Sequence, residues 1–328
     1  MIKLLVAVFC LGILMLSTDV LPQSTPPQST RPVKLHGKLS VKGSQLIDEH
    51  GNPIALNGVS LGWHCWWPRF WNKQCVTWLA TDWKISVVRA SLGVDPKGGY
   101  LDKTAWSKQT LDTVVQAAID NDLYVIIDWH TEGTKLAEAK AFFTEMATKY
   151  GKHPNIIYEL LNEPVKQTWP QVKDYSTEVI KAIRAVDPNN IIIVGNPHWD
   201  QDIDQPAKDP IAGQTNIMYT VHFYAASHGK WLRDKCDAAM KKGIAIFITE
   251  SAAMQASGNG ALNVTEWQAW VDWCAKNKVS LITWSISDKD ETCSMLLPTA
   301  AGDGNWKDTD LKESGKRTRE MLRKAAEK

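Results

Sequence analysis

Residues 157–165, Ile-Tyr-Glu-Leu-Leu-Asn-Glu-Pro-Val, decide the fold that this sequence predicts. The apolar start of this stretch is typical of a buried strand, and the proline stops it. Residues 245–251, Ala-Ile-Phe-Ile-Thr-Glu-Ser, repeat the pattern. Glu163 and Glu250 therefore each stand where an apolar, strand-like run ends. If the two strands are parallel strands of one barrel, both carboxylates open toward the same mouth.

From residue 53 onward, short apolar runs alternate with amphipathic stretches, which is typical of repeated strand-helix units around a parallel sheet. Eight such runs are present, and eight units close a barrel. We therefore predict an α/β fold, a (β/α)8 TIM barrel. The expected strands are Ile54–Val59, Val87–Leu92, Tyr124–Trp129, Ile156–Leu161, Ile191–Gly195, Met218–Phe223, Ala245–Thr249 and Leu281–Ser285.

Two segments between these strands have apolar residues at helical spacing and predict helices outside the barrel. They are residues 111–119 and 172–186, and the second runs into the turn sequence Asp-Pro-Asn-Asn at 187–190. Ahead of the barrel, residues 39–47 predict a small β-hairpin that closes its N-terminal face.

The N-terminus predicts secretion. Lys3 precedes the apolar stretch Leu4–Leu16, which is too short to cross a bilayer and is typical of a signal peptide. The alternative is an uncleaved N-terminal anchor. We expect a signal peptide at 1–22, a linker rich in Pro, Ser and Thr at 23–35, and one catalytic domain at 36–328, without a separate carbohydrate-binding module. The mature protein is then extracellular.

Composition narrows the choice of partner. The formal net charge is +1 and 22% of the residues are charged, which argues against nucleic acid as the ligand. The chain has 16 tryptophans against 6 phenylalanines, and flat indole rings suit stacking on sugar rings. We expect a polysaccharide partner, no membrane partner and a monomer with an open cleft.

Secretion makes the cysteines informative, because disulfides persist outside the cell. Five remain after residue 22, and we favour the pairs Cys65–Cys75 and Cys236–Cys274, with Cys293 free. Sequence alone leaves the connectivity open. Asn263, in an Asn-Val-Thr sequon at the start of an expected helix, is a candidate sugar attachment site.

Polar and aromatic residues gather at the expected strand ends, where barrel enzymes place their chemistry. Each one alone has an ordinary structural explanation, such as a salt bridge or a core position, but together they indicate a site. Asp128 fits a supporting role or a purely structural one equally well. The set is Arg89, Asp128, Trp129, His130, Asn162, Glu163, His222, Tyr224, Glu250 and Trp284.

Four segments in this order resemble glycoside hydrolase family 5, and within it the secreted endo-β-1,4-glucanases of bacteria and some plant-feeding invertebrates. They are Leu-Asn-Glu-Pro at 161–164, Val-His-Phe-Tyr at 221–224, Ile-Thr-Glu-Ser at 248–251 and Trp-Ser-Ile-Ser-Asp-Lys-Asp-Glu at 284–291. The resemblance spans roughly residues 36 to 320.

The resemblance implies a retaining hydrolase with Glu163 as general acid/base and Glu250 as nucleophile. It also implies that Asn162 binds the substrate's 2-hydroxyl, and that Arg89, His222 and Tyr224 position and tune Glu250. We place His130 in the supporting set as well. Independently of the resemblance, such a mechanism needs two carboxyls about 5 Å apart, one protonated and one ionised. An arginine beside Glu250 would keep that carboxyl ionised while Glu163 holds its proton.

The resemblance further implies a substrate cleft whose walls carry aromatic rings. It places Trp199 and Trp284 against sugar rings on the non-reducing side of the cut, with Lys289 and Glu291 bonding hydroxyls further along. Trp66 lies in a loop, residues 63–71, that forms either a wall of the same cleft or a hydrophobic cluster. Many relatives carry a histidine soon after the first strand, where this chain has Ser-Leu-Gly-Trp at 60–63, and His64 is the candidate replacement.

Other functions fit parts of the pattern. The same barrel and glutamate pair could serve an endo-β-1,4-mannanase or xylanase, because a fold does not decide the sugar. A catalytically inactive carbohydrate-binding protein would not need both glutamates and their partners. A metal-dependent hydrolase could take Asp128, His130 and His222 as ligands, but no HExxH motif is present. We therefore expect no metal and no cofactor.

Overall fold

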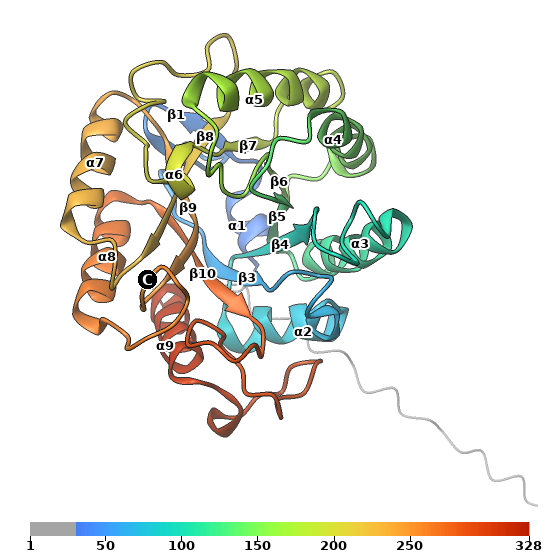
Figure 1. Ribbon diagram of the computed structural model, residues 1–328, viewed down its shortest axis with the longest axis vertical. Helices are drawn as coiled ribbons and strands as arrows, with labels where there is room; N and C mark the ends of the chain where they lie inside the picture. The colour runs from blue at the N-terminus through green and yellow to red at the C-terminus, as the bar shows by residue number, and fades with distance from the viewer. Residues whose placement is uncertain (1–30, 328) are drawn as a thin grey trace, which may run out of the picture.

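The computed structural model describes residues 31–327, and in it eight parallel strands close a barrel in the order β10-β3-β4-β5-β6-β7-β8-β9. Figure 1 shows the strands inside a ring of helices. The predicted (β/α)8 barrel is confirmed. The barrel strands are β3 (Asn57–Leu61), β4 (Val87–Gly93), β5 (Tyr124–His130), β6 (Ile156–Glu159), β7 (Ile191–Val194), β8 (Ile217–Tyr224), β9 (Ile246–Ala252) and β10 (Ser280–Ile286).

The first strand begins later than predicted. Ile54 and Leu56 are buried in the cluster at the N-terminal end of the barrel, and they precede β3. Gly58 then lets β3 approach β4 closely, since a Cβ atom there would lie 1.8 Å from the carbonyl oxygen of Val87. The apolar character of residues 54–56 therefore serves to close the barrel end.

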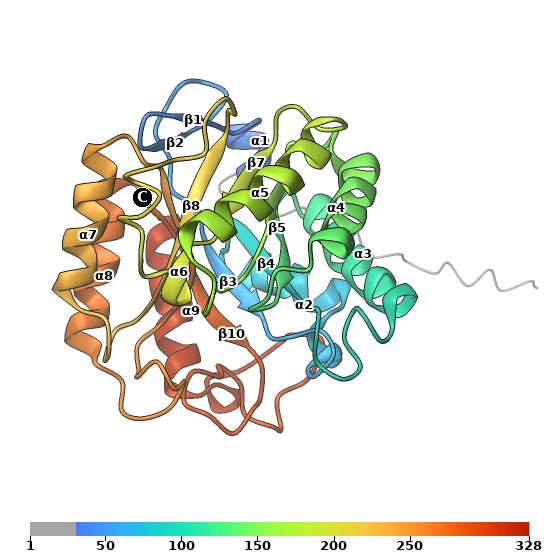
Figure 2. The same ribbon diagram turned by 45° about the horizontal axis from the view of Figure 1, so that its top comes forward.

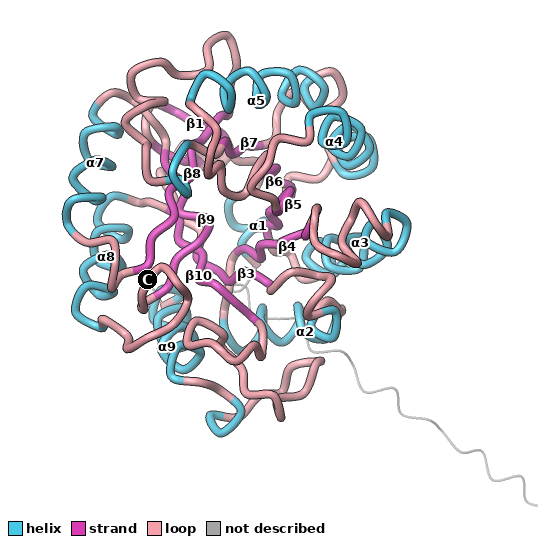
Figure 3. Tube along the Cα trace, viewed as in Figure 1, coloured by secondary structure: helices cyan, strands magenta, loops and turns pink. Residues whose placement is uncertain are grey.

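Helices cover the outside of the barrel, as the tube in Figure 3 shows. The two predicted helices are confirmed as α3 (Thr104–Asp120) and α5 (Trp169–Arg184). A capping box between Thr168 and Gln171 starts α5. The others are α2 (Lys73–Trp78), α4 (Leu136–Tyr150), the short α6 (Pro197–Asp200), α7 (Lys230–Lys241), α8 (Val264–Asn277) and α9 (Glu313–Ala326), with shorter turns at η2 (Pro68–Phe70), η3 (Leu79–Trp83) and η4 (Asp308–Asp310).

The predicted hairpin closes the N-terminal end of the barrel. Strands β1 (Ser40–Lys42) and β2 (Gln45–Ile47) pair antiparallel and lie, with helix α1 (Pro32–His36), at one end of the molecule in Figure 2. Leu39 and Leu46 pack on inward-facing strand residues such as Phe247. The Tyr124 hydroxyl donates to the Gly37 carbonyl at 2.6 Å.

The predicted linker boundary at residue 35 is wrong, because α1 already begins at Pro32. Val33 is buried, and its N–H donates to the Asp122 carbonyl at 3.1 Å. A Pro-rich composition predicted an extended chain, but proline also suits the first turn of a helix. The folded part thus includes residues 32–35, whereas the expected signal peptide lies outside the described residues.

The five cysteines of the described region are free thiols, so neither predicted disulfide is formed in this structure. Cys65, in the loop after β3, faces Gly93, whereas Cys75 is a fully buried residue of α2. Cys236 and Cys274 are both buried in the same core. Burial, and after it the neighbouring Cys236 thiol, raises the pKa of Cys274 well above its usual range. The pairing of these two stays a prediction.

Asn263 caps α8, because its side-chain oxygen accepts a hydrogen bond from the Glu266 N–H at 3.1 Å. The residue is exposed, and the attachment of a sugar to it stays a prediction. Between residues 31 and 327, no helix is both long and apolar enough to cross a membrane.

Candidate active site

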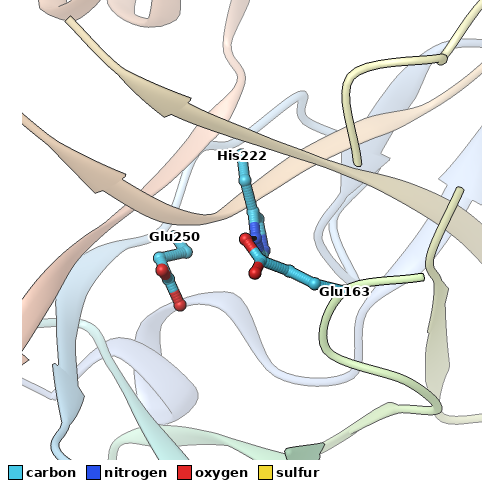
Figure 4. Close-up of side chains that lie close together, drawn as sticks. All are labelled: Glu163, His222 and Glu250. Carbon is cyan, nitrogen blue, oxygen red and sulfur yellow. Dashed lines mark hydrogen bonds and ion pairs between the residues drawn. The ribbon is translucent and has the colours of Figure 1, made fainter. Parts of the chain in front are cut away.

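The polar side chains expected at one mouth of the barrel do converge there. Glu250 stands in β9, His222 and Tyr224 in β8, and Glu163 in the loop that follows β6. Figure 4 shows the carboxyl groups of Glu163 and Glu250 turned toward each other, with the His222 ring beside them. A carboxylate oxygen of each glutamate and a ring nitrogen of His222 lie within 4.8 Å of one another.

Both oxygens of Glu250 accept hydrogen bonds from fixed donors. Arg89 Nη1 donates to Oε2 at 3.1 Å, and the Tyr224 hydroxyl donates to Oε1 at 2.8 Å. Burial, and after it the nearby Glu163, raise the pKa of Glu250, while His222 and Arg89 oppose the rise. A cation and a phenol that donate to a carboxylate favour its ionised form and fix its orientation, as a nucleophile requires.

Glu163 has a different environment. Its Oε1 lies 2.8 Å from His222 Nδ1. Burial raises the pKa of Glu163 to about 8, and the carboxylates of Glu132, Asp128 and Glu159 add to the rise against the opposing charge of Arg89. At neutral pH this group therefore carries a proton, as a general acid must.

Arg89 is fully buried beneath the two glutamates, and six side-chain oxygens lie within 3.4 Å of its guanidinium nitrogens. Its Nε donates to Glu159 at 2.7 Å and its Nη2 to the other oxygen of Glu159 at 3.2 Å, which makes a two-point contact. The Asn162 oxygen accepts from Nη2 at 2.6 Å. Arg89 thus positions Asn162 and Glu250 together.

Glu159 was missed as a site residue. It ends β6 fully buried, and burial raises its pKa while Arg89 opposes the rise. A signal was present in the sequence, because a carboxylate inside an otherwise apolar buried strand needs a cationic partner. The partner, however, lies 70 residues away in sequence, so no local pattern points to it.

Asp128 and His130 form a second buried pair beside Arg89. His130 Nδ1 lies 2.7 Å from Asp128 Oδ2, which is also 3.0 Å from Arg89 Nη2. Burial raises the pKa of Asp128 to about 7 and lowers that of His130 well below its usual range. The His130 ring stacks on Trp284 with centroids 5.3 Å apart. Asp128 thereby holds the ring that backs Trp284.

The aromatic residues near the site differ in how much of each side chain is exposed. Trp66 is 51% exposed and Trp199 is 45% exposed, whereas Trp284 is only 8% exposed and rests on His130. Trp63 stacks on Trp66 with centroids 4.6 Å apart. In the same loop, Trp71 is buried and its Nε1–H donates to the Gly62 carbonyl, which fits the hydrophobic-cluster alternative for that ring.

Lys289 and Glu291 form an ion pair of 2.5 Å in the loop after β10. His64, the candidate replacement for a histidine after the first strand, contacts the backbone of β4 and helix α3. It is fully buried, its Nδ1 accepts from the Gly93 N–H at 3.1 Å, and its Nε2 lies 2.8 Å from the Ser107 hydroxyl. His64 therefore anchors the loop after β3 against α3.

Across residues 31–327, one group of acidic and histidine side chains has the spacing of metal ligands, and its members are Glu163, His222 and Glu250. The alternative ligand set considered from the sequence, which contains Asp128 and His130, is not this group. Both oxygens of Glu250 already accept hydrogen bonds, one of them from Arg89. A cation there would have to displace the guanidinium, so the donor set suits acid-base chemistry better than metal binding.

The family model, two similar sequences and a similar structure all carry cellulase or endoglucanase names. The model of the cellulase family (glycosyl hydrolase family 5) matches residues 47–290. An endoglucanase of Clostridium saccharobutylicum is 42% identical over 314 residues, which cover 94% of this chain and 70% of that protein. Endoglucanase Z of Dickeya dadantii is 41% identical over 297 residues, 90% of this chain and 67% of that protein. A variant of the catalytic domain of Thermobifida fusca endoglucanase Cel5A, solved in complex with cellotetraose, has a TM-score of 0.85 at 33% identity, covering 89% of this chain and 99% of that one.

Proposed function

Because the chain belongs to glycoside hydrolase family 5 and is a glycoside hydrolase of the cellulase type, we propose that it cuts internal β-1,4-glucosidic bonds of cellulose and related β-glucans with retention of configuration. The observation that supports this most is the pair of carboxyl groups with oxygens within 4.8 Å of each other, close to the roughly 5 Å that a retaining mechanism needs. In an inverting enzyme the two carboxyl groups are about 6.5–9.5 Å apart, which leaves room for a water between them.

In the first step, Glu250 attacks the anomeric carbon while Glu163 donates its proton to the leaving glycosidic oxygen. In the second step, Glu163 accepts a proton from water, which attacks the anomeric carbon and frees Glu250. The contrast between the two environments supports these roles. Arg89 and Tyr224 hold Glu250 ionised, whereas burial keeps the proton on Glu163.

Asn162 is proposed to bind the 2-hydroxyl of the sugar at the cut. Its oxygen already accepts from Arg89 at 2.6 Å, which leaves its NH2 group free to donate to the substrate.

Trp199, Trp284 and Trp66 would stack on sugar rings along the cleft, and Lys289 and Glu291 would form hydrogen bonds with sugar hydroxyls. The relative from Thermobifida fusca was solved with cellotetraose, and this chain is proposed to bind a β-1,4-glucan in the same way. We also propose that it acts outside the cell, as a monomer.

The proposal is tested by following viscosity against reducing ends on carboxymethyl-cellulose, mannan and xylan, for the wild type and for Glu250→Gln. A fast fall in viscosity on the cellulose derivative alone, abolished in the variant, supports an endoglucanase. Equal or faster cutting of mannan or xylan would assign the other substrate class, and binding without cutting on all three would point to a sugar-binding protein.

A further inference from the structure

Asp200 lies beside His222, and none of the roles described above involves it. It ends the short helix α6 after β7, where His198, Trp199 and Asp200 all have left-handed backbones, with φ of 55°, 53° and 61°. Each such residue costs roughly 1–2 kcal/mol relative to an ordinary conformation. This turn exposes Trp199 and buries Asp200 completely.

The Asp200 carboxyl group has one satisfied oxygen and one unsatisfied oxygen. Oδ1 accepts from the Asn196 N–H at 2.6 Å. Oδ2 has no hydrogen-bond partner among residues 31–327, and it lies 3.5 Å from His222 Nδ1. A buried oxygen without a partner is costly, and more so if it is charged. Within residues 31–327, this oxygen therefore faces His222 Nδ1, the same nitrogen that contacts Glu163.

The protons around His222 can be assigned from its other partners. Arg89 donates to both oxygens of Glu159, so Glu159 is a carboxylate. The Thr249 hydroxyl gives its one proton to Glu159 at 2.6 Å and must accept from His222 Nε2 at 2.9 Å. Burial lowers the pKa of His222 to about 4, so the neutral ring carries its proton on Nε2.

Nδ1 of His222 is consequently an acceptor that faces two carboxyl groups. Glu163 Oε1 lies at 2.8 Å and Asp200 Oδ2 at 3.5 Å. While Glu163 is protonated, it donates to Nδ1. After Glu163 has given its proton to the leaving group, a carboxylate would face the lone pair of Nδ1 with no hydrogen between them.

We propose that Asp200 is a second acid on His222 Nδ1, which keeps its own proton through the cycle and donates it to this nitrogen whenever Glu163 is a carboxylate. The inference rests on the proposed function of Glu163. No proton is consumed, because the Asp200 hydrogen only turns toward Nδ1. His222 then stays neutral with its proton on Nε2, and the Glu163 carboxylate remains a free base for the water of the second step.

The charges around Asp200 favour its neutral form. Glu163, in the loop after β6, and Glu159, in β6, both disfavour a negative charge on Asp200. Arg89, in β4, is a cation that favours the negative charge. Burial first, and then the charges of Glu163 and Glu159, raise the pKa of Asp200 well above its usual range, against the opposing effects of the Asn196 N–H and Arg89. Asp200 thus acts as a positioning residue for the acid/base.

Asp200→Asn and Asp200→Ala form a matched pair for the test, because the asparagine NH2 can donate to Nδ1 and alanine cannot. The readouts are the basic limb of the pH profile of kcat/KM and the 15N spectrum of His222 above that limb. We expect Asp200→Asn to move the basic limb by less than about 0.3 of a pH unit. Asp200→Ala should move it about one unit lower, because His222 then shifts its proton to Nδ1 and stabilises the Glu163 carboxylate.

Two results would overturn the inference. If Asn and Ala lower the basic limb equally, Asp200 is an anion whose charge raises the pKa of Glu163. If His222 in the wild type carries its proton on Nδ1 at high pH, the Asp200 proton is not needed. Activity of the wild type on carboxymethyl-cellulose is measured in the same series. A wild type without this activity would contradict the proposed function, whereas the comparison of the two variants tests the role of Asp200.

Discussion

Glu163 and Glu250 carry the same functional group and are set apart by what surrounds them. Glu250 accepts from a guanidinium and a phenol, whereas Glu163 contacts a neutral imidazole. Two carboxyls in unlike environments are how one site supplies both an acid and a base near neutral pH. The division of labour thus follows from the partners.

The pH profile should be bell-shaped. Glu163 must be protonated to act as the acid, so kcat/KM falls as the pH rises through about 8, the pKa that burial gives it. Glu250 must be ionised, and since its pKa is raised, the acidic limb should lie above the usual range of a glutamate. Initial rates on a soluble cellooligosaccharide between pH 3 and 10 measure both limbs. A rate still rising at pH 10 would contradict the assignment.

Glu163→Gln should remove the basic limb and lower kcat on a natural glucan by about 10²–10⁴-fold, because no acid protonates the leaving oxygen. The loss in kcat/KM should be far smaller on an aryl cellobioside whose leaving group needs no proton. Glu138→Gln, which neutralises an exposed carboxylate of α4, is the control for the charge change. Equal losses on both substrates would show that Glu163 is not the acid.

Glu159→Gln should destabilise the protein by about 3–5 kcal/mol, since it leaves the buried Arg89 without the partner that it contacts at two points. Unfolding in urea measures the change in free energy. Glu178→Gln breaks surface pairs with Lys181 and Lys140 and should leave the free energy of unfolding nearly unchanged. Similar values for the two variants would mean that Arg89 does not depend on Glu159.

At the scale of elements, the close approach of β3 and β4 brings the site residues of the two strands side by side. Ser60 pairs in register with Arg89, and Gly58 is the residue that permits the contact. Gly58→Ala would force its Cβ onto the Val87 carbonyl, so we expect a loss of at least about 3 kcal/mol or of soluble protein. Gly133→Ala, which meets nothing within 4 Å, should be tolerated. Thermal unfolding of both variants is the measurement, and an unchanged Tm in Gly58→Ala would contradict this account.

The element pattern could be predicted well where local signals are strong. Alternating runs identified all eight barrel strands, and helical spacing identified α3 and α5. The errors fall where tertiary contacts override composition. Residues 32–35 look like linker but form a helix that packs on the barrel, and residues 54–56 look like strand but close the barrel end.

At the scale of the whole molecule, the barrel brings together residues that are distant in sequence, and this limits what sequence can predict. The residues that carry the proposed chemistry stood out because they end strands. Glu159, Thr249 and Asp200 escaped notice because their roles depend on contacts with Arg89 and His222 across the barrel. Such partners become visible only when the barrel closes.

Removal of metal should leave the whole enzyme unaffected. Arg89 and Tyr224 donate to both oxygens of Glu250, so we expect the proposed mechanism to need no metal ion. Dialysis against EDTA should change neither kcat nor Tm. A loss of activity restored by a divalent cation would show that Glu163, His222 and Glu250 serve as ligands.

The central claim is that Glu250 forms a covalent bond to the sugar. Incubation with an activated 2-deoxy-2-fluoro-cellobioside, which slows the second step, should trap the glycosyl-enzyme, and mass spectrometry of its peptides locates the adduct. We predict one cellobiosyl unit per chain, attached to Glu250. An adduct on another residue, or no adduct together with products of inverted configuration, would contradict the account.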